Sequence, residues 1–182
     1  MPLILWLNGG PGASSLLGLL AEHGPFHTND YSEIVANHSQ TDNDNPVPVL
    51  FYNNYTWTKV SHVLYLESPA GVGYSFCGDT DTTDADVDVD VEVDVLDCPH
   101  WNDSLVASDN YEIVVQFFKA FPEYQTNPFY ITGESYGGIY VPTLVMQIEH
   151  HQNTNSYVCS YLSVCLVCVI DSLYVTCNVM YC

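Results

Sequence analysis

The segment GESYG at residues 133–137 constrains the fold of this chain more than any other part of it. An apolar run at residues 128–132 precedes it, and a helical stretch that extends to about His150 follows it. Glycines two residues before and after a serine let a strand and a helix pass close to a sharp turn, which holds the serine hydroxyl clear of the sheet. The bare pattern arises by chance in roughly one chain of this length in twenty. The flanking strand and helix are what the turn requires, so we expect Ser135 to be a nucleophile.

A second glycine-rich loop follows another apolar run. Residues 2–7 are apolar and lead directly into NGGPG at residues 8–12, a pattern typical of a buried parallel strand that enters a tight loop. A serine nucleophile needs two backbone amides for its oxyanion, one from the next residue and one from an earlier strand-to-helix loop. Tyr136 can supply the first amide. Gly9 and Gly10 suit the second, because glycine lets the backbone approach an oxyanion; taken alone, NGGPG also fits an ordinary turn.

The remaining apolar patterns predict alternating strands and helices. Residues 49–52 and 60–67 are typical of strands, and a short helix capped by Ser14 or Ser15 should follow the NGGPG loop. The clearest helix ends near Pro122, because its candidate core side chains recur at three- and four-residue spacing. They are Val106, Asn110, Ile113, Val114, Phe117, Phe118 and Phe121. This order of elements predicts an α/β fold with central parallel strands.

The charge balance is strongly acidic. The chain has 22 Asp and Glu residues against two lysines, and its formal net charge of −20 argues against nucleic acids and anionic membranes as partners. Nine of the acids lie in an Asp–Val run at residues 79–97, which we interpret as an inert surface insertion because a line of carboxylates repels itself. A calcium loop is a sharper alternative, but Val91 stands where such a loop requires glycine. We expect Cys77 and Cys98, which flank the run, to close it with a disulfide.

The last part of the chain differs in composition from the rest. We expect residues 1–156 to form a partial domain and residues 157–182, rich in Cys, Val and Tyr, to be a tail foreign to it; a core fragment or an anchor is the alternative. Within residues 157–182 the longest uncharged run is shorter than the roughly 18 residues of a membrane span, and Asp171 interrupts the region. Cys165 and Cys168 lack the second pair that a zinc site needs, so we expect neither a metal nor a cofactor.

Three sequons for N-glycosylation suit a protein of the secretory pathway. A Ser or Thr stands two residues after Asn37, Asn54 and Asn102, so these are the expected N-glycan sites. The N-terminus has no basic segment and no cleavage site. It therefore does not predict a signal peptide, and we expect the chain to begin inside a domain.

Five motifs occur in the order and at the intervals of one enzyme family. They are WLNGGPGASS (residues 6–15), EHGPF (22–26), LYLESPAGVGYSF (64–76), FFKAFPEY (117–124) and FYITGESYGGIYVP (129–142). In these segments the chain resembles the serine carboxypeptidases, and the resemblance covers roughly residues 2–27, 49–78 and 104–149. It implies an α/β-hydrolase fold, removal of C-terminal residues from peptides or proteins, and a location in the vacuole or lysosome or outside the cell.

The resemblance also implies a role for each site residue. Ser135 would be the nucleophile, and Gly10 and Tyr136 would give the oxyanion amides. The network that would bind the C-terminal carboxylate of the substrate consists of Asn8, Glu22 and Glu134. A buried acid must be protonated to donate a hydrogen bond to a carboxylate, so such a site should work best in acid.

The sequence departs from the family in two places. Ala13 stands where the family usually has cysteine. The family order is Ser, then Asp, then His, but beyond the helix this sequence has only Asp171 and no histidine. His150 and His151 would lie about 22 Å from Ser135 along a helix, too far to accept its proton. We therefore expect this chain to hold the nucleophile half of an incomplete fold, without the C-terminal Asp and His, and to be inactive alone.

Two other functions remain open. An acyltransferase of the same family keeps the serine but need not bind a free carboxylate, and such relatives tend to have other residues where Asn8 and Glu134 stand. A non-catalytic protein would keep the peptide-binding residues without turnover.

Overall fold

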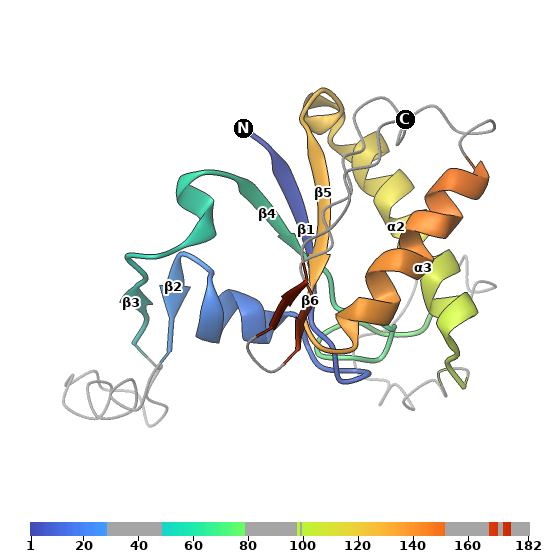
Figure 1. Cartoon of the computed structure of the whole chain (residues 1–182), viewed down its shortest axis with the longest axis horizontal. Coiled ribbons are helices and arrows are strands. Elements are labelled where there is room, and N and C mark those ends of the chain that lie inside the picture. Colours follow the sequence, from blue (N-terminus) through green and yellow to red (C-terminus); the bar gives the residue numbers. More distant parts are fainter. Residues whose placement is uncertain (29–48, 79–97, 99, 152–167, 171–172, 176–182) are drawn as a thin grey trace, which may run out of the picture.

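Three parallel strands form the sheet that carries the site (Figure 1). Strand β1 (Leu3–Leu7) lies between β4 (His62–Tyr65) and β5 (Phe129–Gly133) and runs parallel to both. The computed structural model describes residues 1–28, 49–78, 98, 100–151, 168–170 and 173–175. The strands predicted at residues 2–7, 60–67 and 128–132 are therefore present as β1, β4 and β5. They are parallel, as expected for an α/β fold.

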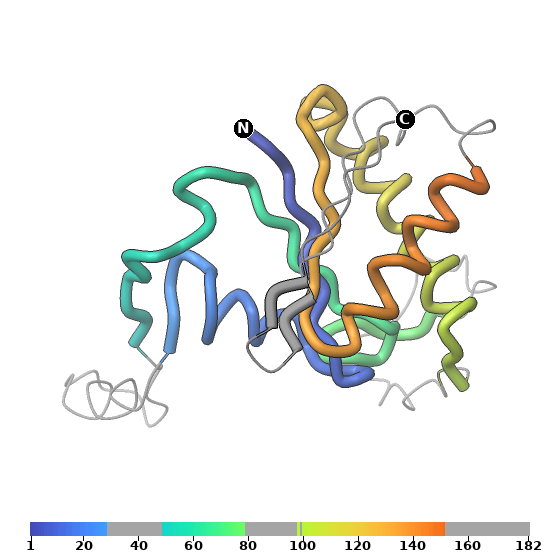
Figure 2. The backbone as a smooth tube through the Cα atoms, viewed as in Figure 1, coloured from blue at the N-terminus to red at the C-terminus, as the bar shows by residue number. Residues whose placement is uncertain are grey.

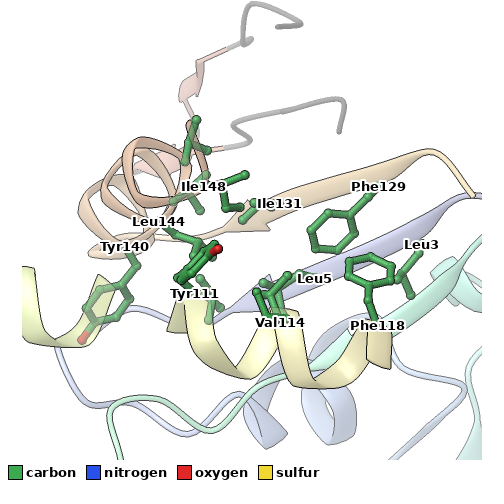
Figure 3. Packing of buried hydrophobic residues seen from close by; sticks show 14 of the residues in the cluster. Leu3, Leu5, Tyr111, Val114, Phe118, Phe129, Ile131, Tyr140, Leu144 and Ile148 are labelled. Atoms are coloured by element: carbon green, nitrogen blue, oxygen red, sulfur yellow. The ribbon is translucent and has the colours of Figure 1, made fainter. Parts of the chain in front are cut away.

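Two helices pack together on one face of this sheet. They are α2 (Asp103–Ala120) and α3 (Gly137–His151), and both lie on the same side of the strands in Figure 1. Side chains from both helices interdigitate with those of β1 and β5 (Figure 3). The buried cluster comprises Leu3, Leu5, Leu7, Val106, Tyr111, Val114, Val115, Phe118, Phe129, Ile131, Tyr140, Val141, Leu144, Val145 and Ile148. Burial of this apolar surface is the main stabilising contribution to the fold.

The buried face of α2 is rotated from the predicted one. Its buried residues are Val106, Ala107, Asn110, Tyr111, Val114, Val115 and Phe118. Ile113 and Phe121 were predicted to face the core, but they are 40% and 47% exposed. The core contacts pairs of adjacent positions in each turn, which places Ile113 at the edge of the buried stripe, and Phe121 lies just beyond the helix.

The ends of α2 follow from its terminal residues. The Asn102 side chain caps the first turn, where its oxygen accepts a hydrogen bond from the Leu105 amide at 3.0 Å. Asp103 in the first turn and Lys119 in the last turn complement the helix dipole. After Phe121, Pro122 begins the short helix η3 (Pro122–Tyr124), since proline cannot continue the hydrogen bonding of α2.

The segments between β1 and β4 lie on the side of the sheet away from α2 and α3, as the backbone trace in Figure 2 shows. They comprise the π-helix η1 (Gly18–Glu22), the strands β2 (Phe26–His27) and β3 (Phe51–Tyr52), and the 3₁₀ helix η2 (Trp57–Lys59). The strand predicted at residues 49–52 is reduced to β3, because it pairs only with the two-residue β2. The buried Asn53 amide donates to the carbonyl oxygens of Glu22 at 3.1 Å and Gly24 at 3.0 Å, and so joins η1 to this segment.

The expected disulfide between Cys77 and Cys98 is present. The acidic run at residues 79–97 that it closes, with the calcium alternative, lies outside the described residues, as do Asn37 and residues 29–48. Strands β6 (Cys168–Ile170) and β7 (Leu173–Val175) form an antiparallel pair. The boundary between residues 156 and 157 stays a prediction. Within the described ranges, no helix is both long and apolar enough to cross a membrane.

Candidate active site

Ser135 lies on the sharp turn between β5 and α3. Its φ of 50° falls in the left-handed region, and among the described residues it is the one non-glycine residue with positive φ. A Cβ at Gly133 would lie 2.6 Å from the carbonyl oxygen of Leu7, and one at Gly137 would lie 3.2 Å from the same atom. The turn is thus pressed against the end of β1, which explains why both flanking positions are glycine. Ser135 itself is exposed where β5 ends.

The loop after β1 lies directly against this turn. A Cβ at Gly9 would lie 2.5 Å from the amide nitrogen of Tyr136 and 2.9 Å from the Cβ of Ser135. Gly10 has a φ of 109°, a conformation that side chains rarely adopt. The structure therefore brings the Gly9–Gly10 segment beside Ser135 and Tyr136. Two amides from adjacent loops are the arrangement that binds a developing oxyanion.

Two hydroxyl groups hold the NGGPG loop in this position. The Ser15 hydroxyl accepts a hydrogen bond from the Asn8 amide at 3.1 Å, and the Tyr140 hydroxyl of α3 accepts one from the Gly12 amide at 3.2 Å. The sequence did not predict either role. Tyr140 lies 128 residues from Gly12 along the chain, so no local pattern could have linked them.

Glu67 connects the same loop to the segment after β4. Its carboxylate accepts a hydrogen bond from the Ser14 hydroxyl, and its other oxygen accepts one from the Tyr74 amide at 2.6 Å. The Ser14 hydroxyl also accepts from the Leu16 amide at 3.2 Å, in the turn that leads into η1. The helix η1 itself has no side-chain cap, so the predicted cap is not found there. Because both of its carboxyl oxygens accept hydrogen bonds from different segments, Glu67 restrains two loops at once.

Asn8 is buried behind the serine turn, and its amide group has a fixed orientation. Its Oδ1 accepts hydrogen bonds from Trp6 Nε1 at 2.7 Å and from the Gly18 amide at 3.2 Å. Its Nδ2 is thereby turned the other way and donates to Glu134 Oε1 at 2.7 Å. Because both acceptor directions of Oδ1 are occupied, the amide cannot flip without losing hydrogen bonds.

Glu22 completes a group of three polar side chains with Asn8 and Glu134. Burial raises the pKa of Glu22, and the nearby Glu134 carboxylate raises it further, while a hydrogen bond with Asn8 has a smaller opposing effect. Two carboxyl groups in one site favour protonation of one of them. The arrangement can therefore present an amide and a protonated acid to a carboxylate ligand. Asn8, Glu22 and Glu134, which the family resemblance implied to act together, are adjacent in the structure.

A cavity of about 680 Å³ opens beside the serine turn. It is lined by Pro11, Gly12, Pro69, Ala70, Gly71, Val72, Cys98, Trp101, Asn102, Asp103, Val106, Tyr136 and Tyr140. The Tyr136 hydroxyl donates to Asp103 Oδ1 at 3.0 Å, and this hydrogen bond is the largest cause of the raised pKa of Tyr136. The mainly apolar lining of the cavity suits an apolar ligand side chain rather than a charged one.

The histidines nearest to the motifs have structural surroundings. His150 and His151 end α3, about 20 Å along the helix axis from its start after Ser135, and His151 stacks on Tyr111 at 4.7 Å. His23 is buried and enclosed by aromatic rings. Asp171 lies outside the described residues. Within the described ranges, no group of three His, Cys, Asp or Glu side chains is placed to hold a metal ion.

Comparisons with known sequences agree on one family. The family model described as serine carboxypeptidase matches residues 1–167. The lysosomal protective protein of Mus musculus is 42% identical over 154 residues, which cover 85% of this chain and 26% of that protein. Serine carboxypeptidase-like 21 of Arabidopsis thaliana is 40% identical over 161 residues, which cover 88% of this chain and 27% of that protein. The chain thus spans about a quarter of the length of these relatives.

A solved structure shares the same architecture. The crystal structure of Kex1, a prohormone-processing carboxypeptidase from Saccharomyces cerevisiae, superposes with a TM-score of 0.65 and 28% sequence identity. The match covers 93% of this chain and 31% of Kex1. The predicted fold class, a partial α/β-hydrolase with central parallel strands, is confirmed.

Proposed function

This chain belongs to the serine carboxypeptidase family, and on that premise we propose that Ser135 is the nucleophile of a serine-type carboxypeptidase that acts on free peptide C-termini. The observation that supports this most strongly is the group Asn8, Glu22 and Glu134 behind the serine turn. An acyltransferase of the family need not bind a free carboxylate, so it does not require paired acids at this place. A ligand with its own carboxylate does need them, because it requires protonated or neutral donors.

The geometry supports a two-step reaction. The Ser135 hydroxyl attacks the carbonyl carbon of the last peptide bond, and the carbonyl oxygen becomes an oxyanion beside the amides of Gly10 and Tyr136. The C-terminal residue leaves with a proton, and water then hydrolyses the acyl ester and restores the serine. The proton of Ser135 passes to a base, which in the family is a histidine oriented by an aspartate. We assign neither His150 nor His151 to that role.

The 182-residue chain should therefore show no carboxypeptidase turnover alone. In the family a histidine accepts the serine proton, and loss of that base costs several orders of magnitude in rate. Release of the C-terminal amino acid from a blocked dipeptide, followed over hours with purified chain, measures this. A burst of product that is lost in the Ser135→Ala variant would contradict this prediction, because it would show that the chain supplies a base for Ser135.

The peptidase itself is tested in a protein that joins residues 1–156 to the Asp- and His-bearing remainder of a family member. We expect hydrolysis of a blocked dipeptide with a free carboxyl group, loss of that hydrolysis in Ser135→Ala, and much slower cleavage of the matching amide. Equal kcat/KM values for the acid and the amide would remove the support for carboxylate binding. They would favour the acyltransferase alternative.

A protein that binds peptides without turnover is the second candidate, and the same three polar side chains support it. The two are separated by labelling the joined protein with a fluorophosphonate, which reacts only with an activated serine. Labelling at Ser135 supports the enzyme. Binding of free-carboxyl peptides without labelling supports the non-catalytic protein.

The surroundings of the sequons suit a secretory protein. Asn54 and Asn102 are both exposed, so each can carry an N-glycan. One relative is named a lysosomal protective protein, and we propose a similar acidic compartment, or the exterior of the cell, for this protein. Neither nucleic acid nor an anionic membrane is proposed as a partner, because the net charge of −20 opposes both.

A further inference from the structure

The side chain of His23 lies beneath the proposed carboxylate site and is not used in the mechanism above. It is 7% exposed, and its ring stacks on Trp57 at 4.0 Å and meets the edge of Trp6 at 4.3 Å. Its backbone is also fixed, because the amide donates to the Gly18 carbonyl oxygen and its own carbonyl oxygen accepts from the Trp57 amide, both at 3.0 Å. The imidazole ring is therefore held in one place.

One ring nitrogen has a partner and the other does not. Nδ1 lies 2.9 Å from the Tyr65 hydroxyl. Nε2 is buried without a hydrogen bond to any described residue, and it lies 3.9 Å from Glu22 Oε2. A buried polar atom without a partner is costly, so the nearby Glu22 carboxyl is the candidate acceptor for this nitrogen.

The protonation states around the ring indicate which nitrogen carries the hydrogen. Burial, and then Glu22, raise the pKa of Tyr65 to about 12, so its hydroxyl remains a donor. Burial lowers the pKa of His23 to about 4, so the ring is neutral in mildly acidic and neutral solution. If Tyr65 donates to Nδ1, the single ring hydrogen of the neutral imidazole lies on Nε2.

We propose that His23 is a positioning residue for the carboxylate site: its Nε2–H donates to Glu22 Oε2 and so orients the Glu22 carboxyl group toward a bound carboxylate. The inference rests on the proposed function of Glu22. Trp6 also links His23 to the proposed carboxylate site, because it contacts the His23 ring and donates a hydrogen bond to Asn8. Among the described residues, the titratable side chains that face His23 are Glu22 and Tyr65, with Glu134 beyond Glu22.

The tautomer is measured first, in the unchanged 182-residue chain with ¹⁵N-labelled histidine. We expect long-range ¹⁵N–¹H NMR spectra at pH 6 to show a protonated Nε2 and an unprotonated Nδ1 for His23. The opposite tautomer, or a charged ring, would overturn the proposal without any substitution.

Three variants then test the effect on the site. His23→Gln keeps an N–H group near the position of Nε2, His23→Phe keeps an aromatic ring but no nitrogen, and Tyr65→Phe removes only the partner of Nδ1. The probe is N-benzyloxycarbonyl-phenylalanine, and its amide is the control ligand. We expect His23→Phe to weaken binding of the acid about tenfold, as loss of one hydrogen bond to a carboxyl group does, and His23→Gln to restore most of it.

The titration of ¹³C-labelled Glu22 gives a second readout that a purely structural role would not move. Loss of a donor destabilises the carboxylate, so the pKa of Glu22 should rise further in His23→Phe and stay near the unchanged value in His23→Gln. An unchanged preference for the acid and an unchanged Glu22 titration in His23→Phe would refute the role of His23. Equal binding of the acid and the amide by the unchanged chain would instead refute the proposed carboxylate site.

Discussion

The Glu134 carboxylate lies close enough to Glu22 to raise its pKa, and the Asn8 amide contacts both side chains. Protonation of Glu22 therefore changes which side chains around Asn8 can donate a hydrogen bond. Asn8 has a fixed donor direction, because Trp6 and Gly18 occupy its oxygen. Glu22 is the group in this cluster whose raised pKa brings its titration closer to neutral pH.

The Glu22→Gln variant should flatten the pH dependence of carboxylate binding. A raised pKa keeps Glu22 protonated, and able to donate, to a higher pH than an ordinary glutamate; that ability is lost as the pH rises through the raised value. Glutamine donates at every pH. Calorimetric titration with N-benzyloxycarbonyl-phenylalanine between pH 4 and 8 should show affinity that falls for the unchanged chain and persists for Glu22→Gln. Superimposed profiles would mean that Glu22 does not titrate with the ligand.

Substitution of Gly133 should destabilise the serine turn. An added Cβ would lie 2.6 Å from the Leu7 carbonyl oxygen, a backbone atom that cannot move aside, and such overpacking costs roughly 1–3 kcal/mol. Gly78 is the matched control, because a Cβ there meets nothing within 4 Å. Urea unfolding of Gly133→Ala and Gly78→Ala should show a large loss of unfolding free energy only in the first. Equal losses in the two variants would contradict the close contact between the serine turn and the end of β1.

At the scale of elements, the sequence predicted the strands and helices that have a strong apolar pattern. Strands β1 and β5 and the helices α2 and α3 were predicted within a few residues, since their buried faces repeat at the expected period. The contacts of Tyr140, Glu67 and His23 could not be predicted. Each depends on a contact between distant segments, such as the 128 residues that separate Gly12 from Tyr140.

The cap of α2 gives a prediction at this scale. Asn102→Ala removes the hydrogen bond to the Leu105 amide and should lower the free energy of unfolding by about 1 kcal/mol, whereas Asn102→Asp keeps a capping oxygen and should change it little. Both variants abolish the sequon, as does Ser104→Ala, which leaves the cap intact. Thermal unfolding of the unglycosylated variants separates the cap from the glycan. A loss in Ser104→Ala as large as that in Asn102→Ala would refute the capping role.

At the scale of the whole molecule, the disulfide that closes the acidic insertion restricts the conformations open to the unfolded chain. The Cys77–Cys98 disulfide spans 21 residues, and such a loop contributes roughly 3 kcal/mol by restricting the unfolded ensemble. The Cys77→Ser, Cys98→Ser double variant should lose about that amount in urea unfolding. The loss should be absent when both proteins are measured under reducing conditions. A double variant as stable as the oxidised chain would show that closure of this loop has no effect.

The strand order also determines where a ligand can bind. The chain leaves β1 toward η1 and leaves the adjacent β5 toward α3, on opposite sides of the sheet (Figure 1). Neighbouring parallel strands whose connections diverge in this way form a topological switch point, which opens a crevice at their carboxyl ends. Pro11 and Gly12 of the NGGPG loop and Tyr136 after the serine turn line the cavity at this place. Its place is a property of the path of the chain, so substitutions in the two loops can alter what the crevice binds while the crevice itself persists.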